Sequence, residues 1–353
     1  MKIKWGVIGC GGIADRRTIP GMMLADNAEL IAVMDANGEV AEKVREKYNA
    51  KYAFDNYEEL LALEEIDAVY IASPVFCHME QATAAAKAKK HILLEKPMAL
   101  TADESAEIAA ICEKEGVKLG VGLMMRFHSY HQEMKKIVAA GKLGDIVSMR
   151  GQLTCWYPDI PNNWRQNKAL SGGGALMDMG IHCIDLLQYI TGLKATEVTG
   201  FAGTQTFSYN ADDSAAIVMK MENGALAMVD SNFNIPDAAA KCKLEIYGTK
   251  GSIMAEGTIS QVEGGDVSVL ISDDSLGYDA AQNRDELVPV KLDVELGNMY
   301  TKEVESFGRA ILNDTEPEIT AADAIFVQTI VERAYAASDN KITSELKYFS
   351  KGN

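Results

Sequence analysis

The sequence predicts a two-part α/β protein. A doubly wound parallel sheet is expected in the N-terminal third, followed by an α+β domain with a large, mostly antiparallel open sheet. Up to about residue 122, short apolar runs alternate with helical patterns, which is typical of strands buried on both faces. A glycine-rich turn follows the first of these runs. Later runs alternate polar and apolar residues, which predicts strands with one covered face.

The N-terminal region contains the alternation of strand and helix that builds a parallel sheet. Strands are expected at 3–8, 30–34, 68–72, 91–94 and 118–121. Helices are expected between them, at 39–48, 78–88 and 102–115. A sheet of this type binds its ligand at the carboxyl ends of the strands.

The C-terminal region is predicted to consist mainly of strands. It begins with a helix at about 129–140 and a long strand at 145–154, and a second helix follows the glycines at 172–174. The remaining strands are expected at 197–201, 214–221, 225–234 and 243–247, and helices at about 299–312 and 321–338 close the chain. Because a chain of 353 residues is longer than one hydrophobic core usually accommodates, we expect two domains, 1–122 and 123–353. Too few helices are predicted to cover the second sheet, so we expect two subunits to pack sheet against sheet.

Composition and charge narrow the possible partners and the location. The chain has 34 Lys and Arg against 51 Asp and Glu, a net charge of -17 that repels nucleic acids and anionic membranes. No segment approaches the roughly 18 apolar residues of a membrane span, and no leader pattern precedes the first strand. The six cysteines are scattered without metal-ligand spacing. We therefore expect a cytoplasmic protein with free thiols and no metal site.

A dinucleotide-binding fingerprint follows the first predicted strand. The segment reads Gly9-Cys10-Gly11-Gly12-Ile13-Ala14, a G-x-G-x-x-A pattern. Gly9 permits the tight turn, Gly11 lets the backbone approach a pyrophosphate, and Ala14 lets helix and strand pack closely. The unpaired N–H groups at the helix start attract the phosphates. We therefore expect a Rossmann domain in which the cofactor is bound by Gly9, Gly11, Gly12, Ile13 and Ala14.

An acidic residue at the end of the second predicted strand bears on the choice of cofactor. Asp35 lies 21 residues beyond Ala14, close to the roughly 20 expected for the carboxylate that binds the ribose hydroxyls. That carboxylate would repel a 2′-phosphate, and the next residues, 36–38, include no arginine to accept one. The sequence therefore favours NAD over NADP.

Later motifs give a specific resemblance. The strand at 91–94 ends in Glu95-Lys96-Pro97, and residues 172–185 read GGGALMDMGIHCID. The other matching segments are Pro74-x-x-x-His78, Arg126-Phe127, Trp164-Arg165 and LEIYGTKG at 244–251. Together with the fingerprint, they resemble the family of glucose–fructose oxidoreductase, inositol dehydrogenase and rhizopine-catabolism proteins over nearly the whole chain. One departure is Val75, where many relatives have a cofactor-binding asparagine, which leaves that contact open.

Three residues in these motifs suit catalysis at an alcohol. Lys96 lies just past the carboxyl end of a parallel strand, where its ammonium can stabilise charge developing on a reacting oxygen. Asp178 and His182 are four apart on a predicted helix and so share one face, where they can handle a proton. Asp185 extends the same face, and we expect it to be structural.

The resemblance implies a nicotinamide-dependent dehydrogenase that acts on a secondary alcohol of a sugar or of an inositol-like cyclic polyol. His182 would take the hydroxyl proton, Lys96 would orient the oxygen, and Asp178 would position the substrate or tune the other two. Further cofactor contacts are expected from Ser73, Pro74, His78, Glu95, Lys96 and Arg126. Substrate contacts are expected from a loop that contains Tyr157, Asn163, Trp164 and Arg165.

The resemblance also implies a homodimer or homotetramer, and it leaves two other functions open. One is a glycoside hydrolase or lyase of the same fold, which keeps NAD bound and oxidises its substrate transiently. The other is a non-catalytic sensor that binds a dinucleotide. Whether the Lys96–Pro97 bond is cis stays open at this stage.

Overall fold

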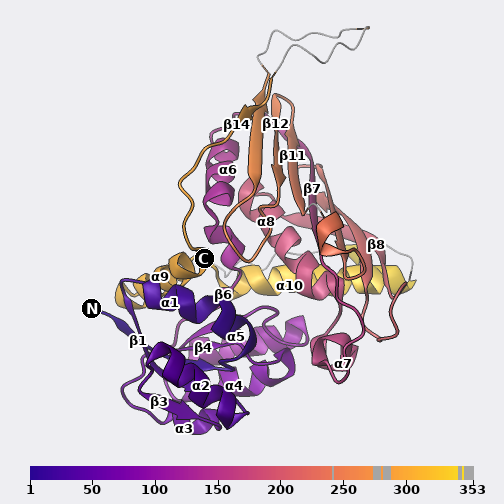
Figure 1. Ribbon diagram of the computed structural model, residues 1–353. Helices are drawn as coiled ribbons and strands as arrows, with labels where there is room; N and C mark the ends of the chain where they lie inside the picture. The colour runs from indigo at the N-terminus through magenta and orange to yellow at the C-terminus, as the bar shows by residue number, and fades with distance from the viewer. Residues whose placement is uncertain (241, 273–279, 281–287, 341–343, 346–353) are drawn as a thin grey trace.

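The N-terminal sheet has the predicted doubly wound topology. The computed structural model describes residues 1–240, 242–272, 280, 288–340 and 344–345. Six parallel strands lie in the order β3-β2-β1-β4-β5-β6, with the direction of winding reversing beside β1 (Figure 1). They are β1 (Ile3–Ile8), β2 (Ala28–Met34), β3 (Tyr52–Phe54), β4 (Ala68–Ile71), β5 (His91–Glu95) and β6 (Leu119–Gly122). This is the strand order of dinucleotide-binding folds.

Both faces of this sheet are buried, as runs that are apolar throughout require. All four residues of β4 are buried, and they alternate between two cores: Ala68 and Tyr70 pack into one, and Val69 and Ile71 into the other. The helices that connect the strands supply the rest of both cores. They are α1 (Ile19–Leu24), α2 (Gly38–Tyr48), α3 (Tyr57–Leu61), α4 (His78–Lys87) and α5 (Ala102–Glu115).

The second sheet is large and open. Its strands lie in the order β14-β13-β12-β11-β7-β10-β9-β8-β15, and every neighbouring pair is antiparallel except β7 and β10. They are β7 (Ile146–Thr154), β8 (Ala195–Gly203), β9 (Ser214–Met221), β10 (Leu226–Asn232), β11 (Lys243–Gly248), β12 (Gly251–Glu256), β13 (Asp266–Ile271), β14 (Val290–Lys291) and β15 (Ser344–Glu345). The predicted fold class is therefore confirmed for both sheets.

Within the described residues, helices cover one face of the second sheet and leave the other open. Along β9, Ile217, Met219 and Met221 are buried, whereas Val218 and Lys220, which alternate with them, are exposed. The buried face packs on helices α8 and α10 (Figure 1). The helices of this half are α6 (Ser129–Ala139), α7 (Lys168–Ser171), α8 (Ile181–Thr191), α9 (Met299–Leu312) and α10 (Ala321–Asn340).

The last two helices return to the N-terminal sheet. Val304 and Phe307 of α9 pack into the core that contains Trp5 of β1. The centres of the Trp5 and Phe307 rings are 5.8 Å apart. Helix α10 runs between the two sheets and packs on both α5 and β8 (Figure 1). The N-terminal sheet ends at Gly122, but the division of the chain into 1–122 and 123–353 stays a prediction.

The structure departs from the expected helices at two points. Residues Ala14–Thr18 after the glycine loop and Leu176–Gly180 after the triple glycine form π-helical turns before the α-helices α1 and α8. π-helical turns are rare in proteins, and those that occur are often found at functional sites. Of the helices within the described ranges, none has the length and apolar character that crossing a membrane requires.

Candidate active site

The glycine loop is shaped by close contact between two strand ends. Gly9 has a φ of +78°, and a Cβ atom at this position would lie 2.6 Å from the backbone nitrogen of Ser73. Only glycine tolerates both the left-handed backbone and the contact. Ala14 is fully buried, as expected where helix and strand pack closely, whereas nothing lies within 4 Å of the space beside Gly12.

Asp35 faces this loop from the end of β2. Its carboxylate accepts hydrogen bonds from the N–H of Gly11 at 3.2 Å and from the N–H of Asn37 at 3.0 Å. A Cβ on Gly11 would lie 3.2 Å from Asp35 Oδ2, so a larger residue would crowd the carboxylate. The glycine loop and this carboxylate therefore fit the pyrophosphate and ribose of a dinucleotide.

His78 links the two loops that follow β4 and β5. One ring nitrogen lies 3.0 Å from the carbonyl oxygen of Ser73, and the other lies 3.0 Å from that of Pro97. Burial lowers the pKa of His78 to about 4, so the ring is neutral at physiological pH. His78 thus packs between the two loops, and its neutral ring, which has one N–H, donates to one of the two carbonyl oxygens. Its expected contact with a cofactor stays a prediction. The Lys96–Pro97 bond in the loop after β5 is cis.

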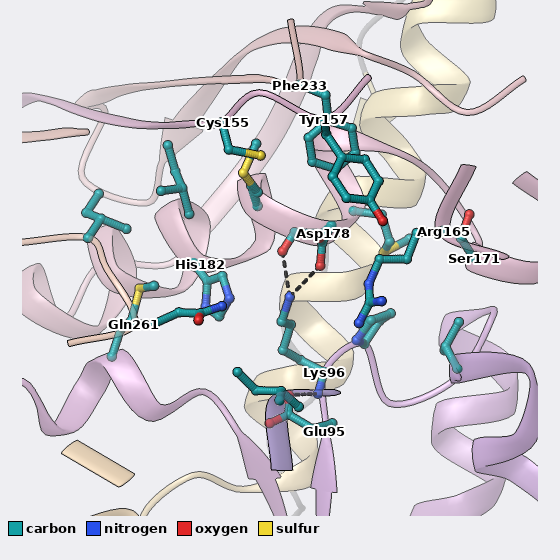
Figure 2. Close-up of a pocket in the computed structure, with 18 of the residues that line it drawn as sticks. Glu95, Lys96, Cys155, Tyr157, Arg165, Ser171, Asp178, His182, Phe233 and Gln261 are labelled. Carbon is teal, nitrogen blue, oxygen red and sulfur yellow. Dashed lines mark hydrogen bonds and ion pairs between the residues drawn. The ribbon is translucent and has the colours of Figure 1, made fainter. Parts of the chain in front are cut away.

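An ion pair between the two halves of the chain lies in the candidate site. Lys96, just past β5, donates to Oδ1 of Asp178 at 2.8 Å and to the carbonyl oxygen of the same residue at 2.7 Å (Figure 2). The Lys96 side chain is 13% exposed and that of Asp178 is 38% exposed, so the carboxylate stays accessible from the pocket. The two parts of the chain therefore meet at the predicted catalytic lysine.

The surrounding charges keep Asp178 ionised. Burial alone would raise its pKa, but the positive charges of Lys96 and Arg165 lower the pKa of Asp178 to about 2. Both basic side chains lie on the pocket side of Asp178 (Figure 2). Asp178 therefore acts as a fixed negative charge and not as an acid near neutral pH.

Asp178 and His182 both line the pocket, and within the described residues no hydrogen bond joins them. The segment that carries Asp178 is a π-helical turn, and its carboxylate is directed to Lys96 (Figure 2). Within the described part of the chain, Nδ1 of His182 is buried and has no hydrogen-bond partner. Burial, together with the charge of Lys96, lowers the pKa of His182 well below its usual value. The imidazole is therefore neutral near pH 7, the form whose ring nitrogen has a free lone pair for a proton, although burial and the charge of Lys96 make it a weak base.

Glu95 occupies the floor of the site beside Lys96. It accepts a hydrogen bond from the hydroxyl of Tyr70 at 2.5 Å and another from the N–H of Lys96 at 3.2 Å. Burial raises the pKa of Glu95. Glu95 lies at the end of β5 and lines the pocket, and its expected contact with the cofactor stays a prediction.

The predicted substrate loop forms one wall of the pocket. The amide of Asn163 donates to the hydroxyl of Tyr157 at 2.7 Å, and the Tyr157 ring packs on Phe233. The indole of Trp164 meets the ring of Phe76 from the N-terminal domain, edge to face. The Arg165 guanidinium lies 4.4 Å from the centre of the Trp164 ring. All four predicted loop residues therefore face the pocket.

Arg126 corrects the expectation of a cofactor contact. Its guanidinium makes two-pronged hydrogen bonds to Asp185, as short as 2.5 Å, and a further one to Asp323 at 3.1 Å. Its side chain is 6% exposed and does not line the pocket. These carboxylates already occupy its donors, so Arg126 joins α8 to α10 and is not positioned to bind a cofactor. Asp185 is structural, as expected.

One cavity of about 750 Å³ collects most of the predicted site residues. Those that line it are Ile13, Ser73, His78, Glu95, Lys96, Tyr157, Asn163, Trp164, Arg165, Asp178 and His182. The other predicted cofactor residues lie outside this lining, at the glycine loop and the neighbouring strand ends, apart from Arg126. They are Gly9, Gly11, Gly12, Ala14, Asp35 and Pro74.

The lining also includes residues that sequence reasoning missed. They are Arg16, Thr154, Cys155, Phe233, Asp237, Ser260, Gln261 and Tyr300, among others. Thr154 and Cys155 could have been found, because they lie at the end of a predicted strand. Gln261 follows β12, which was not predicted, and Tyr300 comes from the distant helix α9. Across the described ranges, no group of three or more His, Cys, Asp or Glu side chains could hold a metal ion.

Comparison with known families matches both halves of the chain. The family described as "Oxidoreductase family, NAD-binding Rossmann fold" matches residues 3–123. The family described as "GFO/IDH/MocA C-terminal domain" matches residues 131–254.

Individual proteins are similar over most of the length. An uncharacterized oxidoreductase, YrbE, of Bacillus subtilis is 32% identical over 72% of this chain and 74% of its own length. D-xylose 1-dehydrogenase (NADP(+)) 2 of Haloferax volcanii is 26% identical over 98% of this chain and 100% of its own. The structure of an aldose-aldose oxidoreductase from Caulobacter crescentus, complexed with glycerol, superposes with a TM-score of 0.88 at 24% identity. That superposition covers 98% of this chain and 100% of the other, and it shows a shared fold.

Proposed function

Since this chain belongs to the GFO/IDH/MocA oxidoreductase family, we propose that it is an NAD-dependent dehydrogenase for a secondary alcohol of a sugar or cyclic polyol. The observation that carries the proposal is the Lys96–Asp178 ion pair, which lies with His182 in one cavity at the carboxyl end of the parallel sheet. Ligands of such sheets bind at this edge. The name of the xylose dehydrogenase relative agrees with a sugar substrate.

Each of the three residues has a distinct task in this proposal. The Lys96 ammonium hydrogen-bonds the reacting oxygen and stabilises the negative charge that develops on it. Asp178 holds the ammonium in place through its side chain and its carbonyl oxygen. His182, which is neutral and faces the cavity, takes the hydroxyl proton. Bound NAD would accept the hydride from the same carbon.

The choice of NAD over NADP rests on Asp35. Its carboxylate lies at the glycine loop, where the adenosine ribose of a bound dinucleotide would sit. A 2′-phosphate at this place would meet a negative charge. Because the name of the xylose dehydrogenase relative includes NADP(+), the preference for NAD needs a direct test, and the assay includes both cofactors.

Polar and aromatic groups on the pocket wall suit a carbohydrate. Tyr157 and Asn163 offer a hydroxyl and an amide, and Trp164 offers an indole face for a sugar ring. We assign these three residues and Arg165 to the substrate. The hydrolase and sensor alternatives find no support in the two relatives described above, which are named as an oxidoreductase and a dehydrogenase.

The test is NAD reduction by the purified protein across a panel of inositols, aldoses, sugar acids and glycosides, followed at 340 nm. We expect one class of compound to reduce NAD, and Lys96→Ala to lower kcat about 100-fold or more, the scale of losing one charge-stabilising donor. Lys87→Ala, which removes an exposed lysine of α4, is the matched control and should keep full activity. No reduction with either cofactor, although NAD binds, would contradict the proposal.

We also propose a homo-oligomer that forms through the open face of the second sheet, and a cytoplasmic location. The uncovered face of β9 supports the first, since its Val218 is 38% exposed. The six free cysteines agree with a reducing compartment.

A further inference from the structure

Helix α10 presents three polar side chains on one face. Gln328, Glu332 and Tyr335 have the spacing i, i+4, i+7, which places them in a row along a helix. Gln328 is buried, and the other two are partly buried. We infer that this row positions both partners of the Lys96–Asp178 ion pair, and so sets the geometry of the proposed catalytic lysine across the junction between the two sheets. The inference rests on the proposed function.

Two members of the row hold the segment that follows Lys96. The Gln328 amide donates to the carbonyl oxygen of Ala99 at 2.9 Å and accepts from the Ser105 hydroxyl at 2.8 Å. The Glu332 carboxylate accepts from the N–H of Ala102, the first residue of α5, at 2.5 Å. A negative charge at a helix start is stabilising. The short loop between Lys96 and α5 is therefore hydrogen-bonded to α10 at Ala99, and the helix that follows the loop is hydrogen-bonded to α10 at its first residue, Ala102.

The third member holds the segment that carries Asp178. The Tyr335 hydroxyl donates to Oδ1 of Asp212 at 2.7 Å. The same carboxylate accepts from the N–H groups of Gly174 at 2.6 Å and Leu176 at 2.9 Å, and the carbonyl oxygen of Asp212 accepts from the N–H of Ala175 at 2.8 Å. Three successive N–H groups, which have no partner within the helix, are thus capped by one distant residue.

The triple glycine is the point where these elements meet. A Cβ atom on Gly172 would lie 2.9 Å from the carbonyl oxygen of Leu100, in the loop after Lys96. One on Gly173 would lie 2.3 Å from the Tyr335 hydroxyl, and one on Gly174 would lie 1.9 Å from the carbonyl oxygen of Asp212. Each glycine therefore admits one of the three neighbours, which explains the motif without any direct role in chemistry.

The consequence for catalysis follows from the geometry of the ion pair. Lys96 bonds to both the side chain and the backbone of Asp178, so a small shift of either segment changes the direction of the ammonium. Displacements of about 1 Å at a reacting group cost as much as 100-fold in rate. None of Gln328, Glu332 and Tyr335 lines the pocket, so they are positioning residues.

The test compares Tyr335→Phe and Gln328→Met with the wild type, using the substrate that the panel identifies. We expect kcat to fall about tenfold or more in each, with KM for NAD changed less than about twofold. In Tyr335→Phe, amide hydrogen exchange should become faster in the peptide that covers 172–178. Tyr57→Phe is the matched control, because it removes a tyrosine–carboxylate bond of 2.6 Å to Glu80 far from this junction.

Two results would overturn the inference. One is a lower melting temperature in Tyr335→Phe with kcat within about twofold of wild type, since a purely structural bond would behave in this way. The other is unchanged exchange at 172–178. Failure of the proposed function has a different signature: the wild type would reduce neither cofactor, or Lys96→Ala would keep the wild-type activity, while the exchange measurement would still report on the contact to α10.

Discussion

Two ion pairs join the ends of parallel strands to the segment 178–185, and they differ in how far each is exposed. Lys96 and Arg126 both follow strands of the parallel sheet, and both pair with a carboxylate of the segment 178–185. Asp178 is 38% exposed to the cavity, whereas Asp185 is 2% exposed. The accessible pair can reach a substrate, and the sealed pair can only hold helices together. Burial, which is a tertiary property, separates the two, so the sequence could not.

A buried carboxyl on α9 makes stability depend on pH. Glu303 is 2% exposed, and within the described ranges both of its carboxyl oxygens lack a hydrogen-bond partner. Burial, reinforced by the negative charge of Glu95, raises the pKa of Glu303 well above its usual value. Between the unfolded and folded pKa values, the native state holds a proton that the unfolded chain has released. The stability contributed by this group is therefore full below about pH 4.3 and is lost as the pH rises through the folded pKa.

Glu303→Gln should remove this pH-dependent loss of stability, because the glutamine side chain does not ionise. We expect its melting temperature to gain on the wild type between pH 5 and pH 8, by about 1–2 °C, the shift that about 1 kcal/mol produces in a chain of this length. Differential scanning calorimetry at a series of pH values measures the difference. Glu316→Gln changes an exposed glutamate and should show no such trend. A difference between Glu303→Gln and wild type that stays constant with pH would refute the explanation.

At the scale of single elements, the strands and helices that depend on local pattern were predicted well. The strand at 3–8, the strand at 214–221 and the helix at 299–312 have the predicted bounds. β3 was missed because it has three half-buried residues, and β12 because it begins with Gly251 and Ser252, which are poor strand formers. The π-helical turn at Leu176–Gly180 was predicted as ordinary helix, and the hydrogen bonds of its first N–H groups to the distant Asp212 are a tertiary contact that no local pattern records.

The start of this helical segment offers a test at the same scale. Gly174→Ala would bring a Cβ atom to 1.9 Å from the carbonyl oxygen of Asp212, a backbone atom that cannot move aside as a flexible side chain would. Overpacking of this kind costs about 1–3 kcal/mol or more. We expect a lower melting temperature and loss of NAD reduction.

Gly203→Ala provides the comparison, because nothing lies within 4 Å of a Cβ at that strand end. It should match the wild type in both measurements. Equal stability of Gly174→Ala and Gly203→Ala would show that the triple glycine is not needed for the contact with Asp212.

At the scale of the whole molecule, the pocket is assembled from segments that only the complete fold brings together. Arg16 follows the glycine loop, Gln261 follows β12, and Tyr300 begins α9, yet all three line one cavity. Sequence motifs identified the residues at strand ends and in the triple-glycine helix, because parallel strands place their carboxyl ends at one edge. They could not identify partners supplied by α9 and α10, whose positions depend on packing against both sheets.

The uncovered face of the second sheet gives the last prediction. Val218 of β9 and Leu226 of β10 are 38% and 50% exposed. Val218→Lys would place a charge within the proposed contact between subunits, where an unpaired ammonium loses its hydration. We expect association to weaken about tenfold or more, seen by light scattering as a shift towards the monomer mass on dilution. Leu24→Lys, at the end of α1, adds the same charge outside the sheet and should leave the mass unchanged. A wild-type monomer, or a Val218→Lys protein with the wild-type mass at every concentration, would rule out this face as the interface.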